Sequence, residues 1–182
     1  MTSFTYKQLC WLTFWLPLGF VVGMSVLVPH KMAAHPAAQG FADFMAQFIP
    51  MLNNIRKIPG ATEWVRFYYA VFWAVSPVFA YIGWCLRRQQ CNEGVYLQPM
   101  SDLKLAFFFF AVLGFCAVCL VWPVADGKSW RDQGVVSNLV GIAHFTMGCV
   151  TFVFGLGASI RVVYARLHFG TTFENALKPE KN

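Results

Sequence analysis

Residues 136–160 read VSNLVGIAHFTMGCVTFVFGLGASI, and the one side chain in this run that could carry a charge near neutral pH is His144. A helix needs about 20 residues to cross a hydrocarbon layer of about 30 Å. The run is long enough to do so, and Arg161 follows it directly. We therefore predict that it forms a membrane-spanning helix.

Three other apolar segments of similar length precede it, at residues 9–28, 64–86 and 103–124. Lys, Arg, Asp and Glu lie at the ends of the four segments or between them, as expected for membrane spans, because a charge inside hydrocarbon is costly. The pattern predicts an all-α membrane protein in which four transmembrane helices form a bundle. Residues 1–182 would then form a single transmembrane domain with a cytoplasmic tail, residues 161–182.

The composition of the chain supports this class. Hydrophobic residues make up 58% of the sequence and charged residues only 12%, whereas soluble proteins contain about 25% charged residues. The excess apolar surface is therefore expected to face lipid. The longest segments outside the spans, 29–63 and 161–182, are too short for a conventional folded domain, so no soluble catalytic domain is expected.

The first apolar segment is also compatible with a signal peptide, because the small residues Ala33 and Ala34 follow it. Its apolar stretch runs from Leu9 to Val28, and only Lys7 precedes it. That stretch is longer than the usual signal-peptide core of about 7–15 residues. We therefore expect the segment to be retained as the first span.

Positive charges that flank the spans predict the orientation, because they tend to remain in the cytoplasm. With both termini inside, eight Lys and Arg residues are cytoplasmic and six are outside. We predict an integral protein of a bacterial inner membrane with its N- and C-termini inside. The net charge of +6 is explained by lipid headgroups rather than by nucleic acid, because no long basic run is present. A cytosolic protein partner would contact the basic positions Arg87, Arg88, Arg161 and Arg166.

One face of the fourth segment carries small and polar residues when the segment is drawn as a helix. Small residues let membrane helices approach closely, so this face either packs against the other spans of the chain or forms a subunit interface or cavity lining. The central glycine of the face is predicted to pack against another helix more closely than any other position of the segment. We call this face the small-residue stripe, and it consists of Ser137, Gly141, His144, Gly148, Thr151, Gly155 and Ser159.

His144 lies in the middle of the small-residue stripe, where both ring nitrogens need partners in hydrocarbon. It could form a structural hydrogen bond to another helix. It could also be a proton- or ligand-sensing site, since ionisable groups inside membranes are functional candidates. A third interpretation is haem ligation, which would need a second axial ligand, whereas His30 and His35 lie only at the outer end of the first span.

Cys116 and Cys119 form a CxxC motif in the third segment, which suggests thiol redox chemistry with a quinone. Such chemistry needs a reachable partner thiol on the outer side, and neither predicted outer loop contains a cysteine. Packing as small hydrophobic residues is the simpler interpretation. Zinc is not indicated, because the sequence has no second CxxC and no nearby pair of His residues. No catalytic residue, metal or cofactor is predicted.

Residues 40–58 have the periodicity of an amphipathic helix. Such a helix can bury its apolar face at the boundary between acyl chains and headgroups, or it can fold back and cap the bundle. Pro50 is expected to kink it. The apolar face predicted to lie on the membrane surface consists of Phe41, Phe44, Met45, Phe48, Leu52 and Ile55.

These observations favour a non-enzymatic, polytopic membrane subunit that assembles through the small-residue stripe, as a homo-oligomer or in a membrane complex. It would recruit or sense a partner at the bilayer, in a defence, exclusion or secretion-type system. One alternative is a channel or transporter subunit with His144 near the pore, although no Asp, Glu, Lys or Arg lies in the interior of a predicted span. The other alternative is a haem or thiol redox membrane protein.

Overall fold

The computed structural model describes residues 6–84, 102–122, 133 and 136–169. This part of the chain is all-helical and contains no strand. The helices are α1 (Tyr6–Leu27), α2 (His30–Ala33), α3 (Pro36–Ala46), α4 (Pro50–Ile55), α5 (Glu63–Trp84), α7 (Asp102–Val121) and α9 (Leu139–Phe169).

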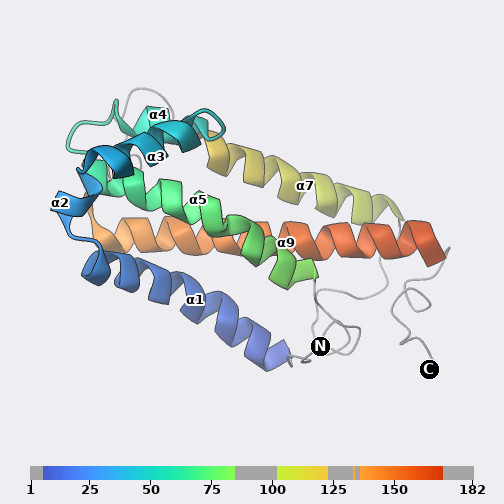
Figure 1. Cartoon of the computed structure of the whole chain (residues 1–182). Coiled ribbons are helices and arrows are strands. Elements are labelled where there is room, and N and C mark those ends of the chain that lie inside the picture. Colours follow the sequence, from blue (N-terminus) through green and yellow to red (C-terminus); the bar gives the residue numbers. More distant parts are fainter. Residues whose placement is uncertain (1–5, 85–101, 123–132, 134–135, 170–182) are drawn as a thin grey trace.

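The four long helices lie side by side, with α1 and α7 running in one direction and α5 and α9 in the other (Figure 1). The longest helix, α9, packs against each of the other three. The short helices α3 and α4 lie beside the first half of α5, and α4 also contacts α7 (Figure 1). One end of the bundle is therefore covered by α2, α3 and α4.

Two of the helices are long and apolar enough to cross a membrane, at Glu63–Trp84 and Leu139–Ile160. The apolar stretches described in α1 and α7 are shorter, at Trp15–Leu27 and Ala106–Val121. Length and composition thus make two helices compatible with membrane insertion. The fourth predicted segment also differs from α9 in extent, because the helix continues through the first part of the predicted tail to Phe169.

The closest approach of two helices is made by α5 and α9. A Cβ atom built on Gly157 of α9 would overlap the carbonyl oxygen of Ala80, and it would lie only 2.7 Å from the Ala80 carbonyl carbon. A Cβ on Gly83 of α5 would likewise overlap the carbonyl oxygen of Phe154. By contrast, a Cβ on Gly148 would meet no atom within 4 Å. Within one chain, α9 therefore makes its close contact with α5 at Gly157, and not at Gly148 as predicted.

The single amphipathic helix predicted over residues 40–58 is divided in two. Helix α3 ends at Ala46, and α4 begins at Pro50, which occupies one of its first two positions. Proline is favoured there because its fixed φ suits a helix start and its missing N–H costs no hydrogen bond. The Asn53 side-chain amide crosses the break and donates to the carbonyl of Ala46 at 3.2 Å. The break lets both helices turn toward α5.

Candidate functional site

The first half of the small-residue stripe is not covered by the other described helices. Ser137, His144 and Thr151 are exposed, and the space beside Gly148 is open. The second half is covered: Ser159 is buried, and a Cβ on Gly155 would touch Val112 of α7. The sides of α9 that face α1, α5 and α7 carry its buried residues, which include Ile142, Thr146, Cys149, Val150 and Val153.

The polar groups of the stripe bond within α9 itself. The His144 Nδ1 atom lies 2.9 Å from the carbonyl oxygen of Val140, one turn back on the same helix. The hydroxyls of Thr151 and Ser159 also donate to carbonyls one turn back, at 2.9 and 2.7 Å. This hydrogen bond therefore joins His144 to its own helix, and not to a neighbouring helix as one interpretation required.

Thr146, unlike His144, takes part in a hydrogen bond to another helix. Its hydroxyl lies 2.8 Å from the hydroxyl of Tyr68 on α5, and both residues are fully buried. The Thr146 hydroxyl also donates to the carbonyl of Ile142 at 2.8 Å, which leaves the tyrosine hydroxyl as the donor between the helices. The sequence held a signal for this pair, because each residue is a polar group within an apolar segment.

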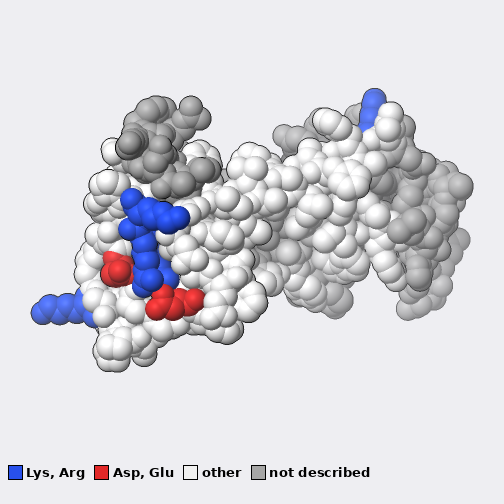
Figure 2. Space-filling view, turned by 90° about the horizontal axis from the view of Figure 1, so that it is seen from above, with Lys and Arg blue, Asp and Glu red and all other residues white. Residues whose placement is uncertain are grey.

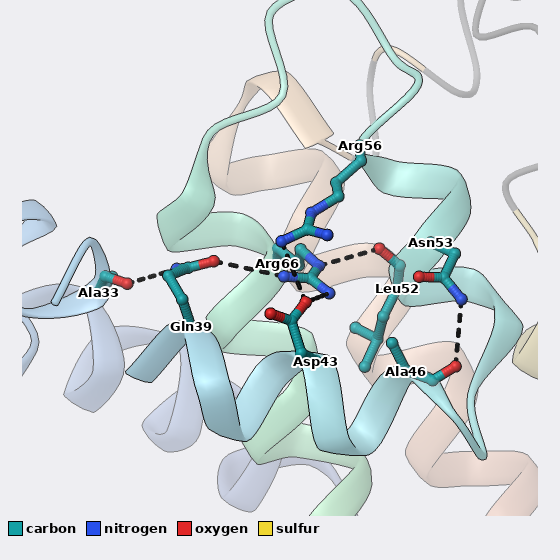
Figure 3. Close-up of polar contacts among 8 residues, drawn as sticks. All are labelled: Ala33, Gln39, Asp43, Ala46, Leu52, Asn53, Arg56 and Arg66. Carbon is teal, nitrogen blue, oxygen red and sulfur yellow. Dashed lines mark hydrogen bonds and ion pairs between the residues drawn. The ribbon is translucent and has the colours of Figure 1, made fainter. Parts of the chain in front are cut away.

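A second polar site surrounds Arg66, in the first turn of α5. Only 1% of this residue is exposed, although it is a charged residue near the start of the predicted span 64–86. Its Nη2 atom donates to Asp43 Oδ1 at 2.6 Å, its Nη1 to Gln39 Oε1 at 3.3 Å and its Nε to the carbonyl of Leu52 at 3.2 Å (Figure 3). One guanidinium thus joins α3, α4 and α5, and we call it and these three partners the Arg66 cluster.

Asp43 is the charged partner of Arg66, and it lies at the surface, with 53% of its side chain exposed. Arg56 approaches the same carboxylate oxygen from outside, at 3.0 Å. The hydrogen bond from Arg66 is the main reason that the pKa of Asp43 is lowered from its ordinary value of 3.8, and the charge of Arg56 adds to it. Asp43 therefore stays ionised at neutral pH, as a buried guanidinium requires.

The position of Arg66 in the sequence already indicates that this residue needs a partner. Arg66 stands between Val65 and Phe67 in an apolar run, and a basic residue in such a run needs a partner. Asp43 lies 23 positions earlier, so only the fold of the connecting segment brings it near. On the face seen from above, acidic and basic side chains gather at the end covered by α3 and α4, while the middle is uncharged (Figure 2).

The apolar face predicted for residues 40–58 is distributed over different surroundings. Leu52 and Ile55 are buried in the core, whereas Phe41 and Met45 are partly buried against it. Two residues remain outside: Phe44 is 55% and Phe48 is 64% exposed. Their rings contact each other edge to face, with centroids 5.4 Å apart. Packing against α5 thus uses one part of the predicted face, and contact of the phenylalanine pair with lipid remains a prediction.

Trp64, in the first turn of α5, ties this helix to the end of α1. Trp64 is buried, and its indole N–H donates to the carbonyl of Val28 at 2.8 Å, which ties α5 to the residue just after α1. His30 packs on the same ring, and His35 accepts a hydrogen bond from the N–H of Ala37 as the cap of α3. Both histidines are therefore engaged at the end of the bundle that α2, α3 and α4 cover.

Cys116 and Cys119 of α7 are buried and unbridged, and so is Cys149 of α9. In the part of the chain that the structure describes, no group of three or more His, Cys, Asp or Glu residues is arranged to hold a metal ion. Of the basic positions predicted to contact a cytosolic partner, Arg161 and Arg166 lie within α9. The other two, Arg87 and Arg88, lie outside the described residues.

Comparison with known proteins identifies no relative: no family model matches the chain, and no curated protein or solved structure is significantly similar to it. The chemistry must therefore be inferred from the two sites. The open half of the stripe offers a helix surface with free space at Gly148. The Arg66 cluster fixes α3 and α4 on the bundle.

Proposed function

We propose that the chain is an integral membrane protein in which α1, α5, α7 and α9 all span the bilayer. Support comes from the outward faces of α1 and α7, the two helices with shorter apolar stretches. On α7, Phe107 is 77% and Phe110 is 65% exposed, and on α1 Val26 is 74% exposed. A soluble protein seldom exposes apolar patches of this extent, whereas lipid covers them without cost. An apolar helix that is not buried is typical of a membrane span.

We expect both termini to lie in the cytoplasm and the end formed by α2, α3 and α4 to lie outside. In the variant Lys57→Cys, a membrane-impermeant maleimide should therefore label the new thiol in intact cells, well above the labelling of the parent chain. Labelling that requires permeabilised cells would reverse the orientation. Extraction of the parent chain from membranes by alkaline carbonate would contradict membrane insertion itself.

Within the membrane, we propose that the chain is a non-enzymatic subunit that assembles with further copies of itself through the open half of the small-residue stripe. The observation that carries this is the open space at Gly148, between the exposed side chains of His144 and Thr151. The second nitrogen of the His144 ring also needs a polar neighbour in hydrocarbon, which a facing helix can supply. The assembled subunit would recruit or sense a partner at the membrane.

Gly148→Leu tests the assembly. A Cβ at this position meets no atom of the same chain within 4 Å, whereas a leucine side chain would hold a facing helix away. We expect native mass spectrometry to show a smaller species for this variant than for the parent, with an unchanged melting temperature. The matched control is Gly114→Leu on α7, an exposed glycine where a Cβ also meets no atom within 4 Å. An unchanged oligomer in Gly148→Leu would mean that this face contacts lipid, and the assembly proposal would fail.

A further inference from the structure

An aromatic and basic surface lies on the outer side of α3 and α4. It consists of Phe44 and Phe48, which are more than half exposed, and of Arg56 and Lys57, which follow α4 and are also exposed. Among the described residues, Lys57 forms no ion pair, and Arg56 pairs with Asp43 alone. We call these four residues the aromatic–basic surface.

The aromatic and the basic residues of this surface are linked through α3. Phe44 lies on α3, and its ring contacts the ring of Phe48, just after the end of that helix, with centroids 5.4 Å apart. Asp43 precedes Phe44 in the sequence. Because Asp43 binds Arg56 at 3.0 Å, the guanidinium reaches the helix that carries Phe44. A ligand with an apolar part and an anionic part can therefore meet both kinds of side chain together.

The packing of α3 and α4 against the bundle holds the aromatic–basic surface in place. Ala42 and Ala46, on the opposite side of α3, are buried in the core, and the Arg66 cluster joins α3 and α4 to α5. Phe44 and Phe48 cannot turn inward without breaking this packing. Binding would therefore cost little ordering of the backbone, since the helices already have their final positions.

The charge at this end of the bundle is positive. From α2 to the start of α5, residues 30–66 contain four Lys and Arg residues and two Asp and Glu residues. The charged side chains gather on the face shown in Figure 2, over α3 and α4. Of the two acidic groups, Asp43 is already neutralised by Arg66. The charges of Arg56 and Lys57, which are exposed at this end of the bundle, favour an anion.

We propose that the aromatic–basic surface binds the headgroup of an anionic phospholipid, with the phosphate on Arg56 and Lys57 and the upper acyl chain on Phe44 and Phe48. This inference rests on the proposed membrane insertion, which places the end of the bundle near the headgroups. Guanidinium and ammonium groups bind phosphate oxygens through charged hydrogen bonds. Aromatic rings are favoured where the acyl chains meet the headgroups. A lipid supplies both chemistries, which inorganic phosphate does not.

The test uses the full chain purified in detergent and titrated with phosphatidylglycerol or with phosphatidylcholine of the same acyl chains, with bound lipid counted by native mass spectrometry. The parent should bind phosphatidylglycerol preferentially. The double variant Arg56→Gln and Lys57→Gln should lose about tenfold in affinity for phosphatidylglycerol, because each basic group near a lipid surface contributes to the attraction. Lys31→Gln, which removes an exposed charge of the same end outside the surface, is the matched control and should bind as the parent does.

Two further variants test the basic and the aromatic parts of the surface separately. Lys57→Gln alone leaves the Asp43–Arg56 pair intact, so it should weaken phosphatidylglycerol binding with no change in melting temperature. Phe48→Gln should weaken the binding of both lipids. Equal binding of phosphatidylglycerol by the parent and the double variant would overturn the proposal, as would full displacement of the lipid by inorganic phosphate. Failure of membrane insertion would instead appear in the carbonate extraction, independently of these titrations.

Discussion

Replacing Arg66 with alanine is expected to lower the free energy of unfolding by about 3 kcal/mol, because the change removes a large buried side chain together with its three hydrogen bonds. The carbonyl of Leu52 and the amide oxygen of Gln39 lose their donor, and a cavity opens beneath α3. We expect α3 and α4 to detach from α5 before the bundle unfolds. Denaturation in mixed detergent micelles would measure the loss, and limited proteolysis between residues 34 and 62 would report the detachment.

Two controls show whether the loss comes from the buried charge or from the volume beneath α3. Arg66→Met keeps most of the side-chain volume without a charge, so it should be less destabilising than Arg66→Ala. Arg56→Ala removes the half-exposed partner of Asp43 and should cost less than about 1 kcal/mol. If Arg66→Ala unfolds at the same detergent fraction as the parent, the Arg66 cluster does not hold α3 and α4 in place.

Gly157→Ala is expected to destabilise the bundle by about 2 kcal/mol, because a single methyl group has no room at the crossing of α5 and α9. The new Cβ would overlap the Ala80 carbonyl oxygen, and backbone atoms cannot turn aside as a flexible side chain can. The helices would have to separate along the crossing, which also loosens the contact at Gly83. Thermal unfolding in detergent, followed by circular dichroism, would measure the effect.

Whether a Gly→Ala change lowers or raises the stability of the bundle distinguishes an effect of close packing from an effect of helix propensity. Gly114→Ala on α7 adds the same methyl group where no atom lies within 4 Å. That control should be neutral or stabilising by up to about 1 kcal/mol, because alanine favours a helix more than glycine does. Stabilisation by Gly157→Ala of the size seen in the control would show that α5 and α9 are farther apart than described.

The sequence predicted α5 and α7 well because each is marked by a continuous apolar run, whereas the run 136–160 did not predict that α9 continues to Phe169. The predicted segments 64–86 and 103–124 differ by at most three residues at either end from α5 (Glu63–Trp84) and α7 (Asp102–Val121). The candidate site was less predictable. Gly155 and Gly157 lie on nearly opposite sides of α9. The spacing of small residues in the sequence indicated the side that carries Gly155, whereas α5 crosses α9 at Gly157.

What the sequence alone determined is the helical class and the apolar character of the long segments, since both follow from residues close together in the chain. Tertiary structure decided which polar residues are buried and what they bind. Arg66 and Asp43 meet across 23 positions, and Tyr68 and Thr146 across 78. No local pattern contains such pairs, because they form only when the break before Pro50 and the crossing at Gly157 bring the helices together.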